Sequence, residues 1–121
     1  MSVLDEIESV LSSMLRITGL TGAIFTDSPG DIISAKMPEN YRIDPQKRFV
    51  ATVLDLKSNL EELDFHFSEL TYSYTENRIV FYDLQCGNLF ILCRSSISRP
   101  FLHLSIKVPC KKLINIMKQL N

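Results

Sequence analysis

The sequence predicts a single domain of the α/β (α+β sandwich) class, in which helices flank one five-stranded, mainly antiparallel meander sheet. Segments with helical spacing of apolar residues alternate with short β-branched and aromatic segments, and turn signals separate them. The predicted order is α-β-β-α-β-β-β-α. The 121 residues fit one domain spanning 1–121, because two halves of about 60 residues would each be marginal.

The first helix and a hairpin occupy the N-terminal third. Apolar residues recur every three or four positions through residues 2–17, with Ser2 as the candidate N-cap and Gly19 as the expected stop. Residues 21–26 and 31–35 are predicted strands. The turn between them, Asp27-Ser28-Pro29-Gly30, has a physical basis, since proline presets φ and glycine supplies the positive φ.

The second helix is predicted from Asp44, as N-cap, and Pro45, as first helical residue, to about Asp64. Val50 and Leu54 widen its apolar stripe to one side. The stripe itself repeats at steps of four and three residues and consists of Phe49, Val53, Leu56, Leu60 and Leu63.

Three further strands are predicted at residues 65–74, 78–84 and 89–93. The last segment is open to two interpretations. Alternation over residues 102–108 favours a strand, whereas spacing over residues 102–120 favours a helix. We expect a helix over most of 100–120, with a bend near Pro109, because proline cannot sit unkinked inside a helix.

No catalytic or metal-binding motif is found, so we expect neither an enzyme nor a cofactor. The sequence has no phosphate-binding loop, dinucleotide fingerprint or nucleophile elbow. His66 and His103 have no partner motif, and Cys86, Cys93 and Cys110 lack zinc-site spacing. The three cysteines are interpreted as small hydrophobes in a reduced interior.

Net charge and hydropathy argue against some classes of partner and some cellular locations. The net charge of −1 argues against a nucleic-acid partner. The N-terminus lacks a secretory signal and the longest apolar run, residues 89–93, is too short to span a bilayer. We therefore expect a cytoplasmic protein without direct membrane insertion.

Residues 15–30 resemble the opening of the Roadblock family of dynein light chains and GTPase regulators. Gly19, Gly22, Asp27 and Gly30 fill the glycine, acidic and turn positions of that family. The Gly87-Asn88-Leu89 turn is similar to the family's fourth-to-fifth strand turn, and residues 99–108 are similar to the last-helix segment of prokaryotic-type members, such as bacterial gliding-motility GTPase regulators. Pro109 departs from the family pattern.

The resemblance implies a profilin-like or longin-like architecture and a dimer. Family members place their second helices antiparallel and pair their third strands into one continuous sheet. The dimer is a platform that contacts a small Ras-like GTPase, and can stimulate hydrolysis, or that links motor or signalling complexes through related Roadblock or longin-type proteins. No catalytic residue of the family can be transferred to this chain.

Charges on the second helix independently suggest self-association. Lys47 and Arg48 lie in its N-terminal turn and Glu61, Glu62 and Asp64 near its C-terminus, which is opposite to what the helix dipole favours. An antiparallel copy would place each basic end beside an acidic end. Solvated surface charge is the simpler interpretation.

Tyr72 and Tyr74 share a face of the third predicted strand, where they either pack in the core or contact a partner. The hypothetical dimer interface thus consists of Lys47, Arg48, Val50, Leu54, Glu61, Glu62, Asp64, Tyr72 and Tyr74. The alternative function is a small-molecule sensor of the profilin-like or PAS-like type. The absence of tryptophan and of convergent polar residues argues mildly against its pocket.

Overall fold

A computed structural model describes residues 2–39, 41–64 and 68–120 of the chain. The elements follow the predicted order: α1 (Val3–Met14), β1 (Leu20–Asp27), β2 (Ile32–Lys36), α2 (Ile43–Glu62), β3 (Glu69–Tyr74), β4 (Asn77–Asp83), β5 (Gly87–Arg94) and α3 (Arg99–Gln119). The predicted fold class is therefore confirmed. The first residues expected for the third strand, 65–67 with His66, lie outside the described residues.

The five strands form one antiparallel sheet in the order β2-β1-β5-β4-β3. From the sequence we expected one continuous meander, and the observed strand order differs from it. A β1–β2 hairpin and a β3–β4–β5 meander are joined where β5 pairs with β1, so that Phe25 lies opposite Leu89. The long connection through α2 makes this possible, because it carries the chain from one edge of the sheet to the other.

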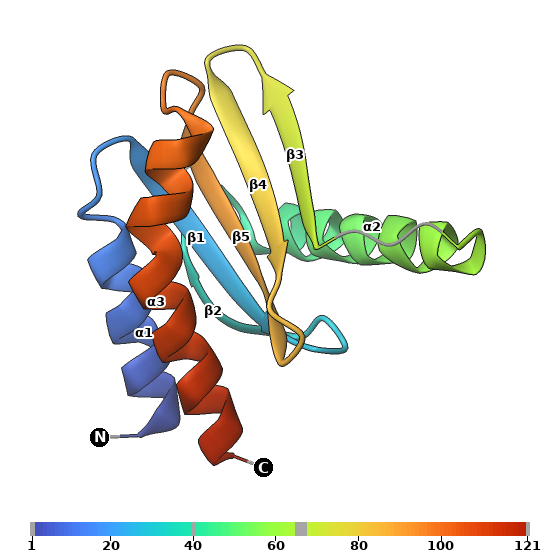
Figure 1. Ribbon diagram of the computed structural model, residues 1–121, viewed down its shortest axis with the longest axis horizontal. Coiled ribbons are helices and arrows are strands. Elements are labelled where there is room, and N and C mark those ends of the chain that lie inside the picture. The colour runs from blue at the N-terminus through green and yellow to red at the C-terminus, as the bar shows by residue number, and fades with distance from the viewer. Residues whose placement is uncertain (1, 40, 65–67, 121) are drawn as a thin grey trace.

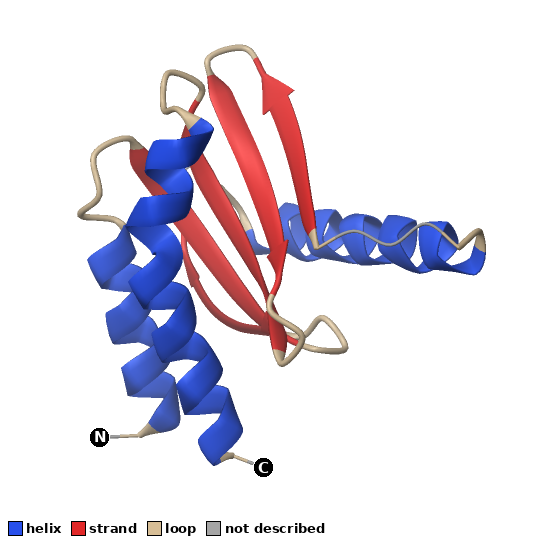
Figure 2. Cartoon of the chain, viewed as in Figure 1, coloured by secondary structure: helices blue, strands red, loops and turns tan. Residues whose placement is uncertain are grey.

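Helices cover both faces of the sheet. Figures 1 and 2 show α1 and α3 side by side on one face and α2 crossing the other. The central strands β1 and β5 are therefore buried along nearly their whole length. The larger core lies under α1 and α3, with members such as Met14, Phe25 and Leu102. The smaller core lies under α2 and consists of Ile24, Val50, Val53, Phe81 and Phe90.

Local signals in the N-terminal third behave as predicted. The Ser2 hydroxyl accepts a hydrogen bond from the Asp5 N–H at 3.1 Å and the Asp5 carboxylate accepts one from the Ser2 N–H at 3.4 Å, which completes a capping box. The turn after β1 closes on Asp27, whose Oδ1 accepts from the Gly30 and Asp31 N–H groups at 3.0 and 2.8 Å. Gly30 has φ +109°, which justifies the glycine there.

The start of α2 differs from the prediction. Arg42, with extended backbone, is the N-cap, and the helix begins at Ile43, so Asp44 and Pro45 already lie inside the first turn. Pro45 is tolerated there because the first N–H groups of a helix have no intrahelical acceptor. The helix ends at Glu62, two residues before the predicted end at Asp64.

The last segment is one helix that continues through Pro109 without a break. Ser98 caps it by accepting a hydrogen bond from the Phe101 N–H at 3.3 Å, and Pro100 occupies the first turn. Leu102, Ile106 and Leu113 bury its inner side against the sheet. The helical interpretation of residues 100–120 is thereby confirmed over the alternating-strand one.

Candidate interaction surface

Helix α2 buries little of its length against its own sheet. Only Gln46, Val50 and Val53 of its described residues are buried. Large apolar side chains stay exposed along it: Ile43 at its start, Leu56 in its second half and Leu63 at its C-cap, where Leu63 exposes 68% of its surface. Helix α2 therefore leaves several large apolar side chains uncovered by its own sheet.

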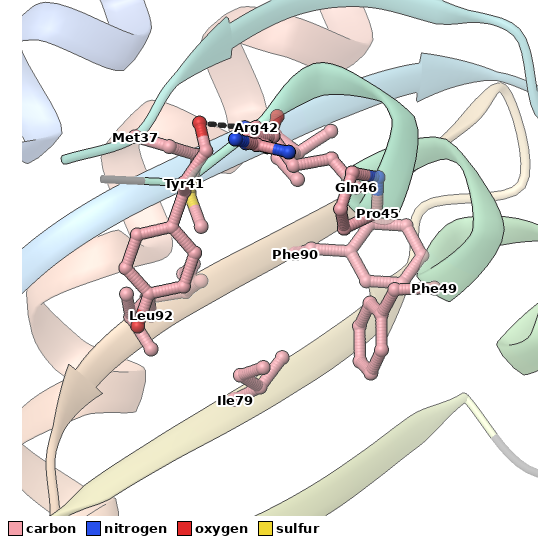
Figure 3. Close-up of a pocket in the computed structure, with 11 residues that line it drawn as sticks. Met37, Tyr41, Arg42, Pro45, Gln46, Phe49, Ile79, Phe90 and Leu92 are labelled. Atoms are coloured by element: carbon pink, nitrogen blue, oxygen red, sulfur yellow. Dashed lines mark hydrogen bonds between the residues drawn. The ribbon is translucent and has the colours of Figure 1, made fainter. Parts of the chain in front are cut away.

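A cavity of about 320 Å³ opens between the first turns of α2, the segment before it and the sheet. Figure 3 shows Phe49 and Phe90 on one side of it and Tyr41 and Leu92 on the other, with Ile79 across the sheet surface. Phe49 packs edge-on against Phe90, with ring centroids 5.9 Å apart. The lining consists of Ile24, Met37, Tyr41, Arg42, Pro45, Gln46, Phe49, Ile79, Phe90, Ile91 and Leu92.

The chemistry of the cavity is that of a receptor for apolar groups. Among the described residues that line it there is no acidic residue, histidine, cysteine or serine, and most of the lining is aliphatic or aromatic. Its polar members are Tyr41, Arg42 and Gln46. The Gln46 amide donates to the Tyr41 carbonyl at 3.1 Å and so fastens the preceding segment to α2. The sequence does not reveal this cavity, because its lining comes from separate segments that no local pattern connects.

The charges predicted on α2 are exposed and lie at opposite ends of the helix. Lys47 and Arg48 are exposed in the first half, whereas Glu61, Glu62 and Asp64 are exposed at the end. Among the described residues, Lys47 and Arg48 form no ion pair. The two ends of α2 therefore differ in sign, as the sequence indicated.

The two apolar residues of the predicted interface on α2, Val50 and Leu54, differ in how far they are buried. Val50 is 1% exposed and belongs to the core under α2, so it positions the helix without offering surface to a second copy. Leu54 is half-buried beside the same core. Val50 lies on the side of α2 that faces the sheet. Spacing alone could not predict this, because it does not distinguish that side from one that would face a partner.

Among the described residues, strand β3 pairs only with β4, so it forms an edge of the sheet. Tyr72 is 59% exposed and lies two residues from Leu70, which packs in the core under α2, so both project to the α2 face. The side chain of Tyr74 lies outside the described part. The edge, Tyr72 and the cavity thus adjoin on one face. An unpaired edge of this kind is a template for pairing with another strand.

The opposite side of β3 is fastened to α3. The Glu69 carboxylate accepts a hydrogen bond from the Arg99 guanidinium at 3.0 Å and lies 3.2 Å from the His103 Nε2. His103 also meets the ring of Tyr82 edge-on, with centroids 5.8 Å apart. His103 therefore contacts β3 through Glu69 and β4 through Tyr82.

The described residues contain no group of histidine, cysteine, aspartate or glutamate that could hold a metal ion. Cys86, Cys93 and Cys110 are all free thiols, and Cys93 is buried. Burial raises the pKa of each thiol, and it raises the pKa of Cys110 to about 11. Burial therefore favours the neutral thiol form of all three cysteines. No helix within the described ranges is both long and apolar enough to cross a membrane.

The sheet order, the helices on both faces and the open β3 edge together define a domain of the Roadblock type in fold. The Roadblock/LC7 domain from Streptomyces avermitilis has this fold, with 17% identity, coverage of 88% of this chain and 96% of that chain, and a TM-score of 0.63. The profilin LokiProfilin1, in complex with rabbit actin, shares the architecture at 17% identity, 96% and 98% coverage and a TM-score of 0.62.

Among proteins of this fold, the chain is similar to MglB. MglB from Myxococcus xanthus shares 14% identity over 98% of this chain and 92% of that chain, with a TM-score of 0.84. The gliding protein MglB from Thermus thermophilus shares 16% identity over 98% and 93%, with a TM-score of 0.80. At these identities the likeness establishes the fold. No protein-family model and no curated protein matches the sequence.

Proposed function

We propose that this chain is a non-enzymatic interaction module that pairs with a second copy of itself and, as a pair, binds and regulates a small Ras-like GTPase. The α2 face of the sheet carries the proposal. It combines an unpaired edge strand, an open apolar cavity and a helix with opposite charges at its ends. A related Roadblock or longin-type protein is the other partner that such a surface fits. The module would act in the cytoplasm, where free thiols stay reduced.

A two-fold axis perpendicular to the sheet, at the β3 edge, joins these features. Such an axis pairs β3 with its copy antiparallel and keeps both α2 helices on the same face, running in opposite directions. In the view of Figure 1, α2 extends past β3, so each helix would lie over the sheet of the other copy. Arg48 of one copy would then approach the acidic end of the other helix, where Glu62 lies.

The cavity supports the same arrangement. It lies on the α2 face beside β4 and β5 and is lined by apolar groups, with Arg42 among its few polar members. The exposed side chains at the end of α2 are leucines flanked by carboxylates. Leu56 and Leu63 of a second copy fit the apolar lining, and Glu62 or Asp64 fits Arg42. Filling the cavity in this way would bury the apolar surface that one copy leaves open.

Pairing is tested by sedimentation equilibrium with two matched single substitutions. Arg48→Glu and Glu62→Lys each change one exposed charge by two units, and each alone should weaken the dimer about three- to tenfold because every dimer contains the contact twice. An equimolar mixture of the two variants should recover the affinity, since the contacts in the mixed dimer are oppositely charged again. Lys112→Glu, on α3, is the control and should leave the dimer unchanged. A wild-type chain that stays monomeric at high micromolar concentration contradicts the proposal.

GTPase binding is tested separately, with small Ras-like GTPases from the same source loaded with GDP or with a non-hydrolysable GTP analogue. The wild-type chain should capture one nucleotide state preferentially, and the Arg48→Glu variant should capture less if the dimer is the binding form. Hydrolysis rates with and without the chain then separate activation from tethering. A lack of binding in both nucleotide states overturns the GTPase proposal and leaves self-association standing.

A small-molecule sensor is the second candidate, and the apolar cavity is the observation that favours it. Its volume of about 320 Å³ lies at the lower end of the range for ligand sites. Native mass spectrometry of the purified chain separates the two functions. A bound amphiphile that remains on the monomer supports a sensor, whereas an empty dimer supports the interaction module.

A further inference from the structure

The outward side of α3 carries an apolar stripe that the proposed α2 dimer does not use. Phe101, Leu104 and Val108 are exposed at positions i, i+3 and i+7, which places them along one side of the helix. Leu104 exposes 74% of its surface. The helix already buries its other side through Leu102 and Ile106, so the outer stripe has no structural task within the described chain.

The same helix is strongly basic. Its 21 residues, Arg99–Gln119, contain five lysine and arginine side chains and no acidic one. Arg99 is paired with Glu69. The remaining four are Lys107, Lys111, Lys112 and Lys118, all exposed and none forming an ion pair with another described residue. In a chain of net charge −1, this is a local concentration of uncompensated positive charge.

The apolar stripe and the lysines lie on the same outer face of α3. Lys107 and Lys111 stand on the turns next to Leu104 and Val108, so an apolar centre is flanked by cations along about two turns of helix. Apolar anchors bordered by charge of one sign are the arrangement that receives an amphipathic helix of the opposite sign. We propose that the outer face of α3 docks an acidic amphipathic helix of a partner protein, on the opposite side of the sheet from α2.

Two other occupants fit the face less well. An anionic membrane surface is flat, and α1 lies beside α3 in the same layer (Figure 1), where Asp5, Glu6 and Glu8 would meet the lipid headgroups and be repelled. A second α3 would bring Lys107 and Lys111 against identical charges. A single acidic helix can follow the α3 ridge alone, which avoids both penalties.

The test uses the full chain and two labelled synthetic helical peptides of about five turns, followed by fluorescence anisotropy. One peptide carries leucines on one side and glutamates elsewhere, and the matched peptide has lysine in place of glutamate. Saturable binding to the acidic peptide only, weakened by added salt, supports the proposal. We expect Leu104→Asp, and separately Lys107→Glu with Lys111→Glu, to weaken this binding at least about tenfold.

Control variants and a vesicle-binding measurement distinguish docking on α3 from the alternatives. Lys47→Glu with Arg48→Glu makes the same charge change on α2 and should leave peptide binding intact, and circular dichroism melting verifies that each variant is folded. The inference is overturned by an absence of saturable binding to the acidic peptide, by an equal loss in the α2 variant, or by binding to phosphatidylserine vesicles without binding to the peptide. Because α3 is apart from the dimer surface, either proposal can fail while the other stands.

Discussion

The ammonium of Lys57 lies 2.6 Å from the Asp83 carboxylate, which connects the second half of α2 to the end of β4. Both side chains are largely shielded from solvent, with 22% and 18% of their surface exposed. Glu61, one turn along α2, lies 3.5 Å from the same ammonium but is more exposed. The Lys57–Asp83 pair is thus a polar tie that holds α2 in place where few apolar side chains are buried.

Removing this tie should loosen α2. Asp83→Asn is expected to lower the free energy of unfolding by about 1 kcal/mol, because it leaves a partly buried ammonium without its closest partner. Urea denaturation measures the change. Glu61→Gln is the control and should change the stability by less than about half of that amount, because exposed pairs contribute little. A larger effect of Glu61→Gln would contradict this ranking.

The same pair predicts a loss of stability at high pH. The pKa of Lys57 is raised above its ordinary value of 10.5, first by the hydrogen bond to Asp83 and then by the charges of Asp83 and Glu61. A raised folded-state pKa gives stabilisation that is fully present below the unfolded-state pKa and is lost as the pH rises through the folded-state value. Between neutral pH and the region above 10.5, the wild type should therefore lose more stability than Asp83→Asn. Equal losses in urea titrations would contradict a role for the pair.

Asn88 is a buried polar residue, and its amide donates to the Thr26 hydroxyl and to the Asp27 carbonyl, both at 3.1 Å. These bonds join β5 to the end of β1 just before the turn. Asn88→Ala should cost about 1–3 kcal/mol of stability, because it removes both bonds and leaves a small void. Thermal unfolding measures it. Asn77→Ala, on β4, is a comparison at a half-buried asparagine and should cost less.

The Tyr82 hydroxyl is buried and has no hydrogen-bond partner within the described structure. Burial raises the pKa of this phenol, and the charge of Glu69 raises it further. A buried donor without a partner costs stability, so Tyr82→Phe should leave the free energy of unfolding unchanged or increase it by up to about 1 kcal/mol. A decrease of more than about 1 kcal/mol would show that the hydroxyl is bonded in solution.

The thiols should react slowly. With a pKa of about 11, Cys110 has far less thiolate at pH 8 than an ordinary cysteine, and its alkylation should be slower by about a hundredfold or more. Iodoacetamide labelling followed by mass spectrometry measures each cysteine, with Cys86 as the less deeply buried internal reference. Rapid labelling of Cys110 in the folded chain would mean that it is less buried than the structure shows.

Signals that act over a few residues could be predicted correctly. Ser2 and Asp5 form a capping box because the partners are three residues apart, and the Asp27–Gly30 turn depends on the backbone preferences of its own residues. The N-cap of α2 is the exception. Asp44 and Pro45 satisfy the rule for a helix start, yet the helix begins at Ile43, since the first turn tolerates both residues.

Only part of the candidate surface could be predicted from the sequence, because sequence patterns act within one element. The sequence alone places Lys47 and Glu62, which carry opposite charges, near opposite ends of one helix. The role of Val50 does not follow from the sequence, because a helical stripe indicates a side that is buried without indicating what buries it. The cavity combines Ile24, Phe49, Ile79 and Phe90, which three strands and a helix bring together. No local pattern connects residues that far apart in the chain.

By itself, the sequence determined the class of the fold, the order of its elements, the local caps and turns and the distribution of charge along α2. These depend on hydrophobic period and short-range hydrogen bonding, which act within one element. Only the tertiary structure decided that β5 pairs with β1, that β3 is left as an edge and that α2 leaves a cavity open beside it. Those outcomes depend on which buried faces pack together over long separations, and the free energy of that packing is a property of the whole sheet and its helices.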